Sequence, residues 1–171
     1  MNNLIKAALF SLLIIGLYTF YSAVVIPPIA TEEQPLEGLA GESIKTVDDL
    51  VALGEAVYNG KGACALCHNP QGGRAPMLEN SAHLAGERIK APGYRGKATD
   101  AEGYLYESLV EPSAYVVPGF GTSGSGDMAS PMPDVRSRSI GLDETEIKAV
   151  IAYLQSVSGV DITVKVEGAG E

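Results

Sequence analysis

The sequence predicts an all-α domain preceded by one N-terminal transmembrane helix, and three observations support this fold class. Apolar residues recur at helical spacing in two segments of the body, residues 47–58 and 147–154, and each segment begins with a helix-capping pattern. The body contains no strand-rich segment. Residues 7–26 are uncharged and dominated by Leu, Ile, Val, Ala and aromatic residues. This stretch is long enough to cross a bilayer.

Residues 1–30 are predicted to be an uncleaved membrane anchor. At ~1.5 Å per residue, residues 7–26 reach the ~30 Å of a bilayer core. A cleavable signal peptide is the alternative, but its apolar region usually has about 7 to 15 residues and ends at a small-x-small site. Neither Tyr21-Ser22-Ala23 nor Pro28-Ile29-Ala30 fits such a site well. Lys6 precedes the span and glutamates follow it, so the positive-inside rule places the N-terminus in the cytoplasm and the body outside it.

An acidic flexible linker is predicted over residues 31–45, which combine glutamates with proline and glycine. The first helix of the body begins at Thr46, a suitable N-cap with acidic residues after it, and ends near Asn59-Gly60. Its apolar stripe follows the spacing i, i+3, i+4, i+7, i+11 and consists of Val47, Leu50, Val51, Gly54 and Tyr58.

The pentapeptide Cys64-Ala65-Leu66-Cys67-His68 comes directly after this helix. Cys-x-x-Cys-His is the attachment signature of a c-type haem, because two thiols three positions apart can add to the two vinyl groups of one porphyrin. The motif therefore favours one haem c, held covalently through Cys64 and Cys67, with the His68 imidazole against the iron. Both cysteines of the chain lie in the motif, so no disulfide framework is expected.

Two other interpretations of the motif are weaker. A redox disulfide of the thioredoxin type belongs to a βαβ chain, and the sequence has no such alternation. A structural zinc site needs four ligands, and the possible set is Cys64, Cys67, His68 and His83. Because Cys67 and His68 are adjacent, tetrahedral closure by that set is awkward.

Two further helices and a tail complete the body. One helix begins at Thr99-Asp100-Ala101-Glu102 and stops at Pro112. The last begins at Asp143-Glu144-Thr145-Glu146 and runs to about Ser156. Residues 159–171 form a C-terminal tail, whose alternating apolar residues are consistent with a short edge strand or with a disordered end.

The net charge of -9 argues against nucleic-acid binding, which requires a basic face. Bases are nevertheless concentrated in residues 61–97, around the haem motif. This stretch could be a docking surface, could neutralise haem propionates, or could be an ordinary solvated face. Tyr94, Arg95 and Tyr115 could hydrogen-bond propionates, although a core or surface role is at least as well supported for each.

The body resembles the class I cytochrome c family over residues 46–158. Four features carry the resemblance: a helix just before Cys-x-x-Cys-His, the loop Arg74-Ala75-Pro76-Met77-Leu78, a late Met-Pro, and a C-terminal helix containing Ala152-Tyr153-Leu154. The resemblance implies a cytochrome c-like helical domain around one covalent haem. It also implies that the first and last helices cross closely, with Gly54 and Tyr58 facing Tyr153 or Leu154.

The resemblance further implies that His68 is the proximal iron ligand and that Met132, in Pro131-Met132-Pro133, is the distal ligand. Pro76 matches the family proline whose carbonyl accepts the Nδ1 hydrogen of the proximal histidine. Met128 and His83 remain alternatives for the sixth ligand. His83 lies in a polar stretch that is predicted to be a loop, where a surface histidine is the default. The Gly-rich residues 119–126 are either a mobile flap over the haem edge or a tolerated insertion.

These features predict a membrane-anchored, mono-haem cytochrome c that transfers single electrons and is not itself an enzyme. The resemblance implies haem attachment on the outer side of the inner membrane, which agrees with a single-pass chain whose haem domain is periplasmic. The expected partners are redox proteins and membrane lipid, and nucleic acid is not expected to be a partner. The chain would act as a tethered shuttle or as a fixed subunit of a respiratory or photosynthetic complex. The alternatives are a zinc-stabilised anchored interaction module, and a haem sensor or peroxidase with an open iron site.

Overall fold

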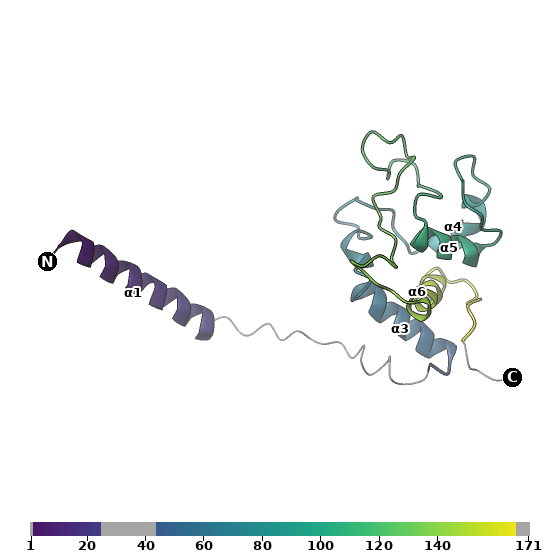
Figure 1. The fold of residues 1–171 in the computed structure, drawn as a ribbon. Coiled ribbons are helices and arrows are strands. Elements are labelled where there is room, and N and C mark those ends of the chain that lie inside the picture. Colours follow the sequence, from purple (N-terminus) through teal and green to yellow (C-terminus); the bar gives the residue numbers. More distant parts are fainter. Residues whose placement is uncertain (1, 25–43, 167–171) are drawn as a thin grey trace. The chain divides into compact units, whose positions relative to one another are not determined.

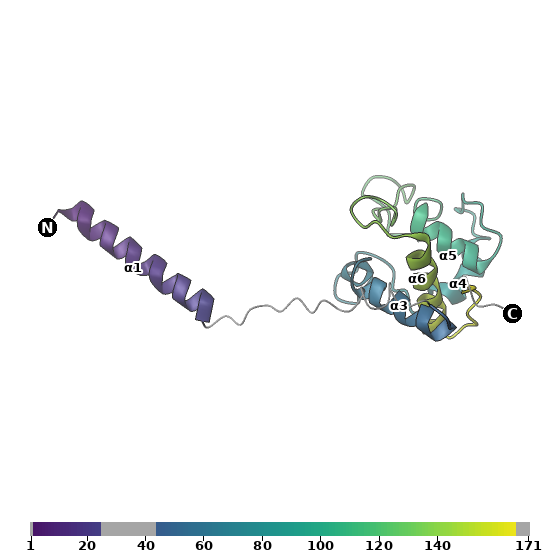
Figure 2. The same cartoon turned by 60° about the horizontal axis from the view of Figure 1, so that its bottom comes forward.

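Two helices from opposite ends of the body, α3 and α6, form the main helix pair of the fold. The computed structural model describes residues 2–24 and 44–166. In Figures 1 and 2, α6 (Glu144–Val157) crosses α3 (Val47–Asn59). A second pair, α4 (Ser81–Arg88) and α5 (Ala101–Val110), packs together, and both of its members also contact α6.

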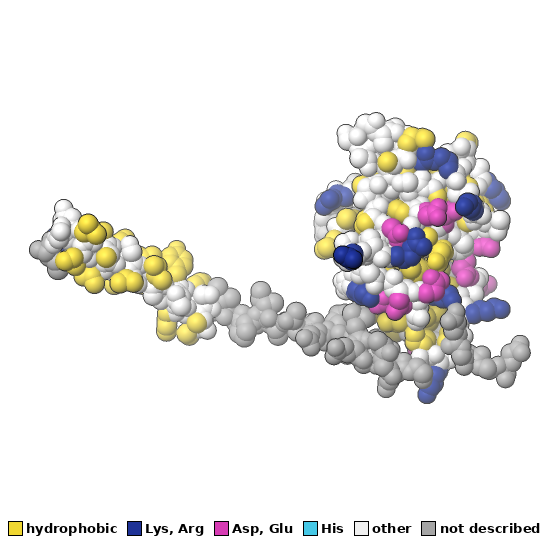
Figure 3. All heavy atoms as spheres, in the orientation of Figure 1, with side chains coloured by type: hydrophobic (Ala, Val, Ile, Leu, Met, Phe, Trp, Pro, Cys, Tyr) yellow, Lys and Arg dark blue, Asp and Glu magenta, His cyan; other side chains and the backbone are white. Residues whose placement is uncertain are grey.

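The described residues confirm the all-α fold class. Their regular elements are five α-helices and the short 3₁₀ turn η1 (Cys64–Leu66), and no β-strand occurs among them. Helix α1 (Asn3–Val24) belongs to a separate compact unit, residues 1–33. None of its residues is buried, and it is long and apolar enough to cross a membrane. Figure 3 shows hydrophobic side chains along it, whereas charged side chains of both signs are mixed over the visible face of the body.

Side-chain caps begin each of the three helices that the sequence predicts in the body. In α3, the Asp49 N–H donates to Thr46 Oγ1 (3.1 Å) and the Thr46 N–H donates to Asp49 Oδ2 (2.9 Å), which closes a capping box. Helix α6 has the same reciprocal pair between Asp143 and Glu146. Helix α5 is capped by Asp100, whose carboxylate accepts from the Gly103 N–H at 2.7 Å.

The crossing of α3 and α6 has the close geometry that the resemblance implies. A Cβ atom on Gly54 would lie 2.0 Å from the carbonyl oxygen of Ala149 and 2.8 Å from Cβ of Tyr153. One turn along α3, the Tyr58 ring packs against the Tyr153 ring, with centroids 5.3 Å apart. Glycine at position 54 therefore allows the two backbones to touch.

Helix α4 corrects the prediction that His83 lies in a loop. The helix starts without a side-chain cap at Asn80 and is only 8 residues long, so its local signal is weak. Its stability comes from packing, because Ala82 and Ala85 are buried in the core. The Ala82 N–H also donates to Ser158 Oγ at 3.2 Å, which ties the start of α4 to the end of α6.

The C-terminal residues 159–166 run along the core in a conformation that is neither strand nor helix. Val164 is 3 % exposed and belongs to the hydrophobic core. Both alternatives predicted for this part of the tail, an edge strand and a disordered end, are therefore wrong. The remaining tail, residues 167–171, and residues 31–43 of the predicted linker lie outside the described residues.

Candidate cofactor site

One cavity of the body brings together all five residues that the sequence assigns to the cofactor. It has a volume of about 380 Å³ and is lined by η1, the loop after it, parts of α5 and the loop before α6. Its lining includes Cys64, Cys67, His68, Pro76 and Met132. Such a volume is within the range of small-molecule and cofactor pockets.

The two cysteines and the histidine are presented by a single tight turn. The N–H groups of Cys67 and His68 both donate to the Cys64 carbonyl, at 3.1 and 2.9 Å. Both thiols are free and partly buried. Burial raises the pKa of the Cys64 thiol to about 11. This direction is opposite to the lowering that is typical of redox-active Cys-x-x-Cys pairs.

The His68 ring is oriented by a hydrogen bond to the loop that follows the motif. Nδ1 of His68 lies 2.7 Å from the carbonyl oxygen of Pro76. A carbonyl oxygen can only accept, so Nδ1 carries the hydrogen and Nε2 keeps its lone pair for a metal. The contact expected for Pro76 is therefore present. The Tyr58 hydroxyl adds a long hydrogen bond, 3.4 Å, to the His68 backbone carbonyl.

The three candidates for a sixth ligand have different surroundings. Met132 is partly buried, packs against the core and lines the cavity. Met128 is 59 % exposed and is not part of the lining, and Arg95 donates to its sulfur at 3.3 Å. His83 is exposed on α4 and is also absent from the lining. The structure thus brings Met132, and neither alternative, to the cavity that holds the motif.

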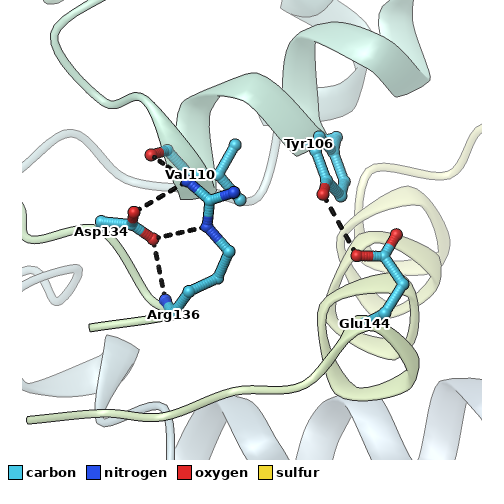
Figure 4. Close-up of polar contacts among 5 residues, drawn as sticks. All are labelled: Tyr106, Val110, Asp134, Arg136 and Glu144. Carbon is cyan, nitrogen blue, oxygen red and sulfur yellow. Dashed lines mark hydrogen bonds and ion pairs between the residues drawn. The ribbon is translucent and has the colours of Figure 1, made fainter. Parts of the chain in front are cut away.

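Hydrogen bonds to the end of α5 hold the segment that follows Met132. The Val135 N–H donates to the Leu109 carbonyl at 3.1 Å. As Figure 4 shows, the Arg136 guanidinium points toward the Val110 carbonyl and the Asp134 carboxylate, which it reaches at 3.3 and 2.8 Å. The bonds to Leu109 and Val110 satisfy carbonyls that the end of α5 leaves free.

The segment that precedes Met132 is tied to the residues just after α5. The Ser130 N–H donates to Ser113 Oγ at 3.0 Å, and the Met132 N–H donates to Ser130 Oγ at 3.1 Å. The sequence does not indicate the contacts of Ser113 and Arg136, because their partners Ser130 and Val110 are 17 and 26 residues away along the chain.

The chemistry of the lining fits a large apolar cofactor with a few polar edges. Ser81 is 3 % exposed, lines the cavity, and its hydroxyl has no hydrogen-bond partner among the described residues. Arg74, Arg88 and Tyr115 also reach the cavity and can donate to carboxylates. Of the three residues considered for propionates, only Tyr115 lines the cavity. Most of the remaining lining is apolar and includes Leu78, Leu105, Leu109, Val116, Phe120 and Leu154.

A zinc site does not form from these residues. Within residues 2–24 and 44–166, no group of three or more His, Cys, Asp or Glu side chains is arranged to hold a metal ion. His83, the required fourth zinc ligand, is exposed on α4.

The body is a helical domain in which one apolar cavity is lined by a Cys-x-x-Cys-His turn, an oriented histidine and a methionine. This is the architecture of a c-type cytochrome. The cytochrome c family model matches residues 51–158, which is more than half of the chain. This chain therefore belongs to the cytochrome c family, whose members carry covalent haem c and transfer electrons. No curated protein matches the chain in a sequence comparison.

Proposed function

We propose that this chain is a membrane-anchored, mono-haem cytochrome c that passes single electrons between protein partners on the periplasmic side of the inner membrane. The observation that carries the proposal is the convergence of Cys64, Cys67, His68 and Met132 on one cavity. The rival ligands Met128 and His83 lie outside its lining.

Each converging residue has a distinct role in holding the cofactor. Cys64 and Cys67 supply the thiols for two thioether bonds, and His68 offers Nε2 because Pro76 occupies its Nδ1 hydrogen. Met132 supplies a soft thioether, which favours the ferrous state and raises the reduction potential. When bound, haem c supplies a centre that takes up and releases one electron. If His68 and Met132 both bind the iron, they would leave no ligand position open for the chemistry of a peroxidase or gas sensor.

The N-terminal helix supports the membrane part of the proposal. Helix α1 has 22 residues, and Lys6 is its one formally charged residue. An apolar helix of this length matches the thickness of a bilayer core, and Lys6 near its start favours a cytoplasmic N-terminus. The body would then act as a tethered shuttle or as a subunit of a respiratory or photosynthetic complex. Recovery of a lone polypeptide after mild-detergent purification would count against the fixed subunit.

The test is optical spectroscopy of the exported, haem-loaded chain. We expect a haem c spectrum equivalent to one haem per chain, with a thioether-to-iron charge-transfer band and no ready carbon monoxide binding by the ferrous form. Met132→Ala should abolish the band and lower the potential, whereas the control Met77→Ala, at a residue that is 40 % exposed, should change neither. A colourless chain, or fast carbon monoxide binding by the unmodified chain, would overturn the proposal.

A further inference from the structure

Two methionines lie close together in the loop that precedes α6, and only one of them lines the cavity. Met128 and Met132 are separated by Ala129-Ser130-Pro131, and their thioethers are chemically equivalent as iron ligands. If Met132 is the sixth iron ligand, as the proposed function holds, Met128 is a potential competitor for the same position. The contacts of Arg95 restrain Met128.

Arg95 donates hydrogen bonds to two atoms of Met128 and to the backbone of Ser113. Its Nη2 donates to the Met128 carbonyl at 2.8 Å and to the Ser113 carbonyl at 2.7 Å. Its Nη1 donates to the Met128 sulfur at 3.3 Å. A thioether sulfur is a weak acceptor, but donation from a guanidinium occupies the sulfur and holds it at the exposed side of the loop.

Hydrogen bonds within the loop around Met128 fix the position of this residue. The Asp127 carboxylate accepts from the N–H groups of Gly119 and Gly121, both at 2.9 Å, and the Thr122 N–H donates to the Ala129 carbonyl at 2.8 Å. A Cβ atom on Gly121 would lie 2.7 Å from Cα of Asp127, so the two sides of the loop touch. Met128 is therefore held by the closed loop on one side and by Arg95 on the other.

We propose that Arg95 is a positioning residue that selects the axial methionine, by holding the Met128 thioether away from the cavity so that Met132 alone reaches the iron. Three acceptors on two residues suit the planar, forked guanidinium better than the single ammonium of lysine. This inference rests on Met132 being the ligand, and the test below separates the two claims.

The test uses the haem-loaded full chain labelled with ¹³C-methyl methionine. In the ferrous protein, the methyl group of an iron-bound methionine is shifted strongly by the haem ring current, and substitution assigns each methionine signal. We expect the unmodified chain to show only Met132 bound, and Met132→Ala to show no bound methionine. In the double variant Arg95→Ala with Met132→Ala, the fraction bound by Met128 should rise about tenfold or more, as expected when charge-assisted hydrogen bonds are lost.

The controls separate selection from general loss of structure. Arg138→Ala with Met132→Ala removes an exposed arginine farther along the same segment and should leave Met128 unbound. Arg95→Lys with Met132→Ala should give a bound fraction between those of the parent and the alanine variant. This second variant also keeps the test valid if Arg95→Ala does not fold, which circular dichroism and haem content would reveal.

The outcomes separate the two claims. The selection role is wrong if Arg95 substitution leaves Met128 unbound in a folded, haem-loaded chain, or if Met128 is already fully bound in Met132→Ala with Arg95 intact. The ligand assignment itself fails if the bound signal of the unmodified chain persists unchanged in Met132→Ala, because that signal then belongs to another methionine.

Discussion

Tyr94 and Arg95 are adjacent in sequence, yet they serve different parts of the molecule. The Tyr94 hydroxyl donates to the Glu107 carboxylate at 2.5 Å and accepts from the Ala98 N–H at 2.6 Å, so it links the loop before α5 to α5 itself. Arg95 reaches instead to Ser113 and Met128. Two neighbouring residues therefore stabilise two different segments, α5 and the loop that contains Met128.

The Tyr94 contact predicts a pH dependence of stability. Burial, followed by the hydrogen bond to Glu107, raises the pKa of Tyr94 from 10.0 to about 12. The folded chain therefore keeps a proton that the unfolded chain releases above pH ~10, so the stabilisation is complete below that pH and is lost as pH rises toward about 12. Tyr94→Phe should lower the free energy of unfolding at pH 7 and flatten its decline above pH ~10.

Denaturant titrations at a series of pH values measure this decline. Part of it should persist in the variant, because burial also raises the pKa of Tyr58 to about 12. An unchanged slope in Tyr94→Phe would contradict the assignment.

Gly54 predicts the effect of a single added methyl group on stability. Alanine there would place Cβ 2.0 Å from the Ala149 carbonyl oxygen, which belongs to backbone and cannot rotate away. We expect Gly54→Ala to lower the free energy of unfolding by about 1–3 kcal/mol. The matched control is Gly86→Ala in α4, where an added Cβ meets nothing within 4 Å. Because alanine favours helix, that change should stabilise by about 0.4–1 kcal/mol. Equal effects in thermal unfolding would contradict the close crossing.

At the scale of elements, residues 159–166 act as a strap that lies outside the family match, which ends at residue 158. Gln155, 2 % exposed in α6, is paired on both atoms of its amide with Thr163: its Nε2 donates to Thr163 Oγ1 at 2.9 Å and its Oε1 accepts from the Thr163 N–H at 3.1 Å. The Thr163 hydroxyl donates in turn to Glu102 in α5. The strap therefore joins α5 and α6 and satisfies a buried amide that would otherwise be unpaired.

Val164 is the apolar anchor of this strap. Val164→Ala should lower the free energy of unfolding by about 1–3 kcal/mol, because it leaves a cavity at a site that is 3 % exposed. Val157→Ala, at a residue that is 43 % exposed near the end of α6, should change it by less than about 0.5 kcal/mol. Denaturant unfolding of both variants provides the comparison. If the two losses are equal, the strap does not contribute to the core.

At the scale of the whole molecule, the features that could be predicted are those whose signals are local. Helices α3 and α6 carry capping boxes and apolar stripes within their own residues, and the Cys-x-x-Cys-His turn is contiguous. Helix α4 and the strap have weak local signals and depend on packing and on partners distant in sequence, such as Ser158 for Ala82. The same reason explains why the loop contacts of Ser113 and Arg95 were not predicted. Both residues reach the loop that contains Met128 and Met132 only in the folded chain.

The division into two compact units, residues 1–33 and 34–171, predicts what happens when the first unit is removed. The described contacts of the cavity, from Gly62 to Leu154, all lie in the second unit. Replacing residues 1–33 with a cleavable export signal should therefore yield a water-soluble body with an unchanged haem spectrum and thermal midpoint.

The full chain should remain in the membrane fraction after a carbonate wash and be released by detergent, because a span of this length is held by its apolar area. Its intact mass should include residues 1–30. A mature chain that begins after Ala23 or Ala30 would contradict the anchor and identify the N-terminal helix as a signal peptide.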